Sequence, residues 1–146
     1  MDFDTDVKLA VYRHIAAAAR TPTVGEVAES VHATPGEVRE AYARLYRNRV
    51  LVLEPDGTTI RMAPPFSGVA TQHRVRIGDK EYFAPCAWDA LGVPAALHAP
   101  AEVLSRCEQS REPIHLRVRE GGPDPEPCVI HFAVPAALWW KDIVYT

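Results

Sequence analysis

Apolar residues in the first 50 positions recur at helical spacing. Between Asp6 and Arg20 they return about every three or four positions, which is typical of one buried helix face. The same kind of pattern predicts a second helix over Val24–Val31 and a third from Pro35 to about Arg49. The N-terminal third of the chain is therefore predicted to contain three consecutive helices.

Two of these helices carry start signals of the capping-box type. Thr23 stands three residues before Glu26, and Thr34 stands three residues before Glu37. In this motif the hydroxyl accepts an early backbone N–H of the helix, and the carboxylate accepts the N–H of the cap residue. Pro35 at the first helical position is a further start signal. The starts of both helices are thus predicted to within a residue.

A β-hairpin is predicted directly after the third helix. Val50–Leu53 is predicted to be a strand, Pro55–Gly57 contains residues that favour a turn, and Thr58–Met62 is predicted to be the returning strand. Three helices followed by a hairpin is the element order of a winged helix-turn-helix. We expect that module over residues 1–62.

The pattern changes from helical to alternating after a Pro-rich linker at residues 63–68. Residues 72–77 and 80–83 alternate polar and apolar positions around a turn at Gly78, which predicts a second hairpin. A strand pair after a helical module indicates a second part of the chain with its own sheet. We place that part over residues 63–146.

A further helix is predicted to open at Pro85, and Gly92–Pro94 is predicted to end or kink it. The fold class that follows is α+β. It consists of an N-terminal winged helix-turn-helix segment over residues 1–62 and a small mixed-sheet domain over residues 63–146.

Composition is that of an ordinary globular protein, with 47% hydrophobic and 24% charged residues among 146. The apolar runs are shorter than a membrane span, and the acidic start Asp2–Asp6 does not resemble a secretory signal. We therefore expect a cytoplasmic protein that does not enter a membrane. Three cysteines, an odd number, do not indicate a disulfide framework.

Charge argues against nucleic acid as a partner. The third helix carries several arginines, which would suit a DNA-recognition helix, but Glu37 and Glu40 lie on the same helix. Residues 1–62 hold eight Lys and Arg against nine Asp and Glu, and the net charge of the chain is −3. Duplex binding depends strongly on phosphate neutralisation. We therefore expect a scaffold and regard DNA binding as the less favoured alternative.

Cys86 and Asp89 are the strongest candidates for chemistry. They stand three positions apart on the predicted helix, so their thiol and carboxyl share one face. A place in the first helical turn would favour the thiolate of Cys86. A soft thiolate beside a protonatable oxygen suits a soft metal ion and a proton. The alternative without a chemical role, a buried cysteine and an aspartate that caps the helix, would give the same two residues at the same spacing.

Residues 64–146 resemble the alkylmercury lyase family. The stretch CAWDALGVPA is the most specific part, and VIHFAVPAALWWKDIVYT near the C-terminus is also similar. The family also has a winged-helix module before its catalytic domain. The resemblance implies protonolysis of carbon–mercury bonds, or binding of an organomercurial or soft metal. Cys86 would be the first thiol and Asp89 the acid–base group. Both would contact mercury, which arrives with the substrate, and no separate cofactor is implied.

The family mechanism uses a second cysteine, which follows the segment that Trp139–Thr146 resembles. Either that cysteine lies beyond Thr146 or this protein lacks the second thiol, and lyase activity of the family type depends on it. The resemblance gives Cys107 a structural place. Cys128 could substitute in space or could pack in the core as a strand residue.

Two weaker patterns remain. Cys128 and His131 have the C-x-x-H spacing of zinc ligands, but the sequence offers no second pair. A pocket for an alkyl or aryl group could be lined by three tryptophans, Trp88, Trp139 and Trp140. The alternative is that they pack in the core, which is the commoner role of such residues. The leading function is therefore a lyase-like role in mercury resistance with a small organomercurial or other thiophilic ligand. The alternative is a winged-helix transcriptional regulator that senses such a ligand.

Overall fold

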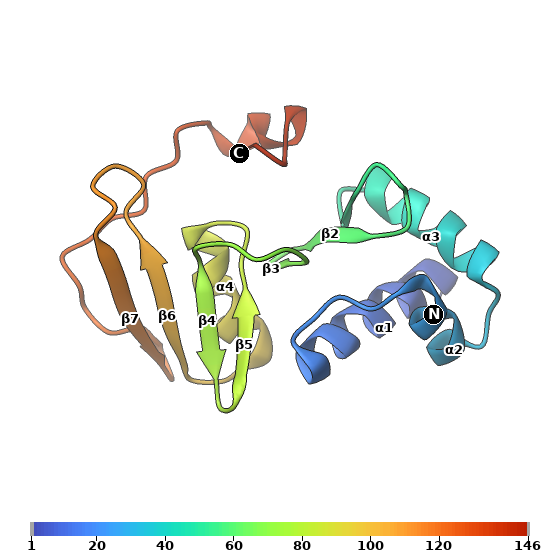
Figure 1. Cartoon of the computed structure of the whole chain (residues 1–146), viewed down its shortest axis with the longest axis horizontal. Coiled ribbons are helices and arrows are strands. Elements are labelled where there is room, and N and C mark those ends of the chain that lie inside the picture. The colour runs from blue at the N-terminus through green and yellow to red at the C-terminus, as the bar shows by residue number, and fades with distance from the viewer. Residues whose placement is uncertain (1, 146) are drawn as a thin grey trace.

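The N-terminal part of the protein is helical. The computed structural model describes residues 2–145. Helix α1 spans Phe3–Ala18, α2 spans Val24–Val31 and α3 spans Pro35–Arg47 (Figure 1). Both predicted capping boxes, at Thr23 and Thr34, are present with their reciprocal hydrogen bonds. The predicted helix starts are confirmed, and α3 ends slightly earlier than the pattern suggested.

A small antiparallel sheet follows α3. Its strands β1 (Val52–Leu53), β2 (Ile60–Ala63) and β3 (Phe66–Ser67) pair in the order β1-β2-β3. The region predicted as a linker thus contributes the end of β2 and all of β3. Gly68 is required there, because a Cβ atom would lie 2.2 Å from the backbone oxygen of Ile60. Helix, helix, helix and hairpin occur in the order that the sequence indicated.

The second sheet has the order β5-β4-β6-β7-β8. Its strands are β4 (Arg74–Ile77), β5 (Lys80–Phe83), β6 (Ala101–Arg106), β7 (Pro113–Arg119) and β8 (Gly122–Pro123). The predicted hairpin is confirmed as β4 and β5. Each pairing within the described residues is antiparallel, so the expected mixed sheet is wrong in that respect. Antiparallel neighbours need only short connections, which suits this short chain.

Helix α4 (Ala87–Leu97) connects β5 to β6 and packs against β4 and β6. The helix does not end at Gly92–Pro94, one of the two predicted outcomes, because it continues through these residues to a left-handed cap at His98. Val93 and Pro94 are buried against the rest of the protein. Packing therefore holds the helix together where local propensity alone would end it.

One hydrophobic core spans both parts of the chain. It includes residues of α1 to α3 and residues of the second sheet and α4. Two tyrosines cross between the parts: the Tyr12 hydroxyl donates to the Pro64 carbonyl at 2.9 Å, and the Tyr82 hydroxyl donates to the Ala16 carbonyl at 2.7 Å. The ring of Phe66 lies between both tyrosine rings. The helical part and the second sheet are thus packed against each other.

The C-terminal segment is irregular apart from a 3-10 helix, η1 (Ala136–Lys141), which contains no buried residue. It runs back from the second sheet toward β2 and β3 (Figure 1). We call residues 124–145 the C-terminal strap. Within residues 2–145, no helix has both the length and the apolar character that crossing a bilayer requires.

The tyrosine contacts give a stability prediction. Tyr82→Phe removes the hydrogen bond to Ala16 and should lower the free energy of unfolding by about 1 kcal/mol. The hydroxyl of Tyr42 is buried without a hydrogen-bond partner among the described residues. Tyr42→Phe should therefore leave the stability unchanged or raise it by up to about 1 kcal/mol. Urea denaturation of both variants is the measurement, and a larger loss for Tyr42→Phe would contradict the assignment.

Candidate active site

Cys86 is the N-cap residue of α4. Its backbone is extended, with φ −148° and ψ 174°, and its Sγ accepts a hydrogen bond from the backbone N–H of Asp89 at 3.4 Å. The thiol thus occupies the place that a serine or threonine oxygen usually fills in a helix cap. The predicted position was one residue off, because Cys86 precedes the first helical turn instead of lying in it.

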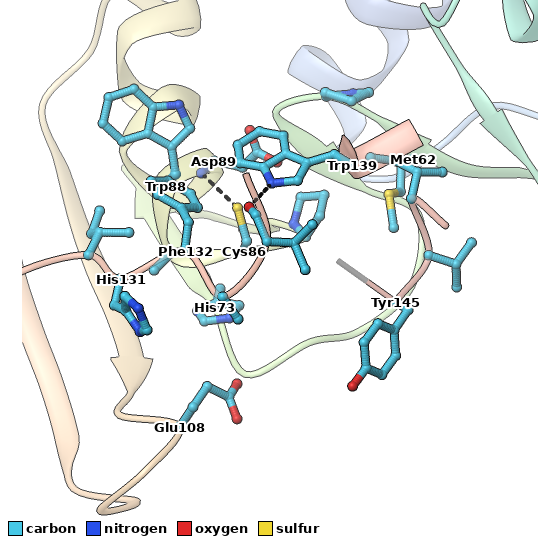
Figure 2. Close-up of a pocket in the computed structure, with 18 residues that line it drawn as sticks. Met62, His73, Cys86, Trp88, Asp89, Glu108, His131, Phe132, Trp139 and Tyr145 are labelled. Atoms are coloured by element: carbon cyan, nitrogen blue, oxygen red, sulfur yellow. Dashed lines mark hydrogen bonds between the residues drawn. The ribbon is translucent and has the colours of Figure 1, made fainter. Parts of the chain in front are cut away.

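Asp89 lies in the first turn of α4, on the same side as Cys86 (Figure 2). Burial raises the pKa of the Asp89 carboxyl, and the interaction with the Cys86 side chain opposes that rise. A carboxyl whose pKa is raised holds a proton more readily than an ordinary aspartate. The structure therefore brings the predicted thiol and carboxyl together in a partly dehydrated place.

The thiol of Cys86 is not activated as the sequence suggested. Burial raises its pKa, and the nearby charge of Asp89 raises it further, although the backbone N–H of Asp89 acts in the opposite direction. The expected lowering of this pKa is wrong, since desolvation outweighs the helix N-terminus. The pKa of the Cys107 thiol shifts in the opposite direction, because hydrogen bonds from Ser110 lower it.

Cys86 and Asp89 open onto a cavity of about 510 Å³. Its walls come from the start of α4, from Met62 and Pro64 beside the small sheet, and from the C-terminal strap (Figure 2). Its polar side chains include His73 and Glu108 in addition to the thiol–carboxyl pair. A cavity with mostly apolar walls and a few polar groups is typical of a small-molecule site.

His73 is a cavity residue that the sequence analysis missed. Its side chain is buried, and its Nδ1 lies 2.7 Å from the Ser105 hydroxyl oxygen. Burial lowers the pKa of the imidazole, although the charge of Glu108 opposes this. The signal was available, because the alternation that turns Val75 inward also turns His73 inward. The polar residues on either side, Gln72 and Arg74, are predicted to face solvent in a hairpin, and this pattern does not indicate a buried site at His73.

The other two thiols do not line the cavity. Cys107 is half-buried in the turn after β6, where its Sγ accepts the N–H of Ser110 at 3.5 Å. Cys128 is exposed and lies in the strap, so the expected strand position in the core is wrong. The cavity wall begins two residues later, at Ile130. Among the described residues no group of three or more His, Cys, Asp or Glu side chains is suited to a metal ion.

The three tryptophans separate into two groups. Trp88 and Trp139 line the cavity, as one interpretation of the sequence expected. Trp140 does not line it, and the Arg49 guanidinium carbon lies 6.0 Å from the centre of its ring. Phe132, which the sequence analysis did not single out, lies between the two cavity tryptophans.

Comparison with known proteins gives concordant matches. The family model of the alkylmercury lyase MerB matches residues 66–146. An alkylmercury lyase of Streptomyces lividans is 29% identical over 128 residues, which are 83% of this chain and 55% of that protein. The chain thus spans about half the length of this curated relative. The crystal structure of the mercury-bound form of MerB2 has the same fold, with a TM-score of 0.65 at 23% identity over 82% of this chain and 59% of that one.

The different environments of the thiols predict their order of alkylation. At neutral pH, iodoacetamide should modify Cys107 faster than Cys86, because only the thiolate reacts and the two pKa values shift in opposite directions. Asp89→Asn removes the charge that raises the pKa of Cys86, so alkylation of Cys86 should begin at lower pH in this variant. Peptide mass spectrometry over a pH series measures both effects. Cys107 is the internal control, and faster labelling of Cys86 in the unsubstituted chain would contradict the assignment.

Proposed function

The chain belongs to the alkylmercury lyase family, and on that premise we propose that it cleaves carbon–mercury bonds by protonolysis. Cys86 captures the organomercurial and Asp89 carries the proton. The observation that supports this most is the pairing of a half-buried thiol with a half-buried carboxyl in the wall of one cavity. Mercury enters as part of the substrate.

Capture begins with a protonated thiol. As mercury bonds to Sγ of Cys86, the thiol proton must leave, and Asp89 is the acceptor beside it. Its raised pKa makes it a better proton acceptor than an ordinary aspartate. The ligand that mercury loses leaves with its own electron pair. The proton released by capture is thereby kept inside the cavity.

Cleavage returns the same proton. Asp89 gives it to the carbon bonded to mercury, the carbon–mercury electron pair forms the new C–H bond, and the hydrocarbon leaves. A second thiolate bonded to mercury adds electron density and makes the carbon a better proton acceptor. Walls that exclude water keep the carboxyl protonated until the carbon is in place.

We propose that Cys128 supplies the second thiolate. It stands two residues before the part of the strap that lines the cavity, in a segment with little regular structure. Cys107 adjoins a cavity residue, Glu108, but the N–H of Ser110 holds its sulfur in the turn after β6, outside the cavity wall. A cysteine from a longer chain, or a small thiol from solution, would fill the same role.

Residues 1–62 are proposed to be a winged-helix scaffold. Two of their arginines have structural partners: Nε and Nη2 of Arg44 donate to the carboxylate of Asp4 at 2.9 and 2.8 Å, and the guanidinium carbon of Arg49 lies 6.0 Å from the centre of the Trp140 ring. These contacts leave fewer cations for a phosphate backbone. They favour the lyase-like function over a transcriptional regulator.

Fluorescence anisotropy with duplex DNA tests the scaffold proposal. At physiological salt the dissociation constant should be weaker than about 1 μM, within the range of nonspecific contacts. Tight binding that depends on the DNA sequence would refute it and would support the regulator instead.

Substitutions in the site test the proposed chemistry. With excess small thiol, the protein should release benzene from a phenylmercury salt, which gas chromatography measures. Cys86→Ser should abolish capture at this site. Asp89→Ala should keep stoichiometric binding and lower benzene release by about 100-fold or more, the usual contribution of a positioned acid.

The second thiol is tested with a matched pair of variants. When no small thiol is added, Cys128→Ser should stop release after capture, whereas Cys107→Ser should behave like the unsubstituted chain. Equal loss in both variants would refute the role of Cys128. Unchanged release by Asp89→Ala would refute the role of Asp89 as the proton carrier.

A further inference from the structure

Three aromatic rings stand in a row at the cavity. Trp88 and Phe132 meet edge to face with ring centres 6.2 Å apart, and Phe132 and Trp139 are tilted with centres 5.2 Å apart. All three side chains line the cavity that holds Cys86 and Asp89 (Figure 2). We call these three residues the aromatic triad.

The aromatic triad is built from both sides of the cavity. Trp88 comes from α4, between Cys86 and Asp89 in sequence, and the other two rings come from the strap. The indole N–H of Trp139 donates to the Val134 carbonyl at 2.7 Å, which fixes the orientation of that ring. The triad is therefore a partly rigid wall beside the thiol and the carboxyl.

Two rings of the triad, those of Trp88 and Phe132, keep large exposed surfaces. Trp88 is 56% exposed and Phe132 is 43% exposed, although each touches an aromatic neighbour. Aromatic side chains that serve only as core bury most of their area. Exposed ring faces beside the Cys86 thiol are instead available to a flat apolar ligand.

We propose that the aromatic triad binds the organic group of the substrate and favours aryl mercurials over small alkyl mercurials. The inference rests on the proposed function for its chemistry, because mercury bonded to Cys86 carries its organic group into the cavity that the triad lines. A phenyl ring can make offset or edge-to-face contacts with these rings. A methyl group offers little area for such contact, so it gains little from the triad.

A thiol-exchange equilibrium tests this selectivity without requiring cleavage. The triple variant Cys107→Ser/Cys128→Ser/Asp89→Ala keeps Cys86 as its single thiol and lacks the proposed proton carrier, so glutathione does not support cleavage during the measurement. It is equilibrated with glutathione and either phenylmercury or methylmercury. The mercury–sulfur bond to glutathione breaks as the bond to Cys86 forms, and the thiol proton passes to glutathione. Intact-protein mass spectrometry gives the exchange constant for each mercurial.

The ratio of the two exchange constants measures the contribution of the aromatic triad, because glutathione has no aromatic side chain that could contact the organic group. We expect phenylmercury to be favoured about 3- to 10-fold, the range of one or two aromatic contacts. Trp88→Ala should reduce the ratio to nearly one through the phenylmercury constant alone, and Trp88→Phe should restore most of it. Phe132→Leu is a second variant with the same expected direction.

Trp140→Ala is the matched control, because Trp140 adjoins Trp139 in sequence but lies outside the cavity wall. It should leave the ratio unchanged. A ratio near one in the parent protein, or equal weakening of both mercurials by Trp88→Ala and Phe132→Leu, would overturn the proposal. Failure of the unsubstituted chain to release benzene would instead refute the proposed cleavage, and the exchange ratio would still be measurable.

Discussion

The contact between Cys86 and Asp89 at the start of α4 is the constraint on which the site depends. The sulfur of Cys86 caps the helix by accepting a hydrogen bond from the backbone N–H of Asp89. The thiol therefore cannot rotate away without leaving this N–H unpaired. The same geometry holds the Asp89 carboxyl one helical turn along the same face. Burial of Ala90 and Val93 anchors the helix against the rest of the protein and fixes where both groups sit.

Burial is also the source of the unusual electrostatics. A thiol at a helix N-terminus is expected to ionise easily, yet desolvation keeps Cys86 protonated until something displaces its proton. In the proposed mechanism a soft metal does so by bonding to sulfur, and the Asp89 carboxylate, whose pKa burial raises, accepts that proton. The raised pKa of each group thus favours keeping the proton on the pair until it is delivered to carbon.

The strap and the N-terminal helices complete the cavity from opposite directions. The strap contributes apolar side chains but buries none of its own in η1, so its position depends on contacts such as the row of aromatic rings. The helices contribute indirectly. Their core is continuous with that of the second sheet, and the tyrosine hydrogen bonds join α1 to the small sheet at Pro64 and to β5 of the second sheet. The helical module, although it is a separate segment of the sequence, is therefore part of the support for the site.

Local signals in the sequence were sufficient for the helix starts, the β4–β5 hairpin and the thiol–carboxyl pair. Capping boxes, turn residues and a spacing of three depend on neighbours in the chain, so they can be recognised without the fold. The course of α4 through Gly92 and Pro94 could not be, because packing against the rest of the protein overrides local propensity there. The pKa direction of Cys86 was likewise outside the reach of sequence, since it depends on how much water this thiol loses to residues distant in the chain. For the same reason only the tertiary structure brought His73, Phe132 and Trp139 to one cavity with Cys86 and left Trp140 outside it. Sequence determined which groups could do chemistry, and three-dimensional packing decided which of them meet and how strongly each holds its proton.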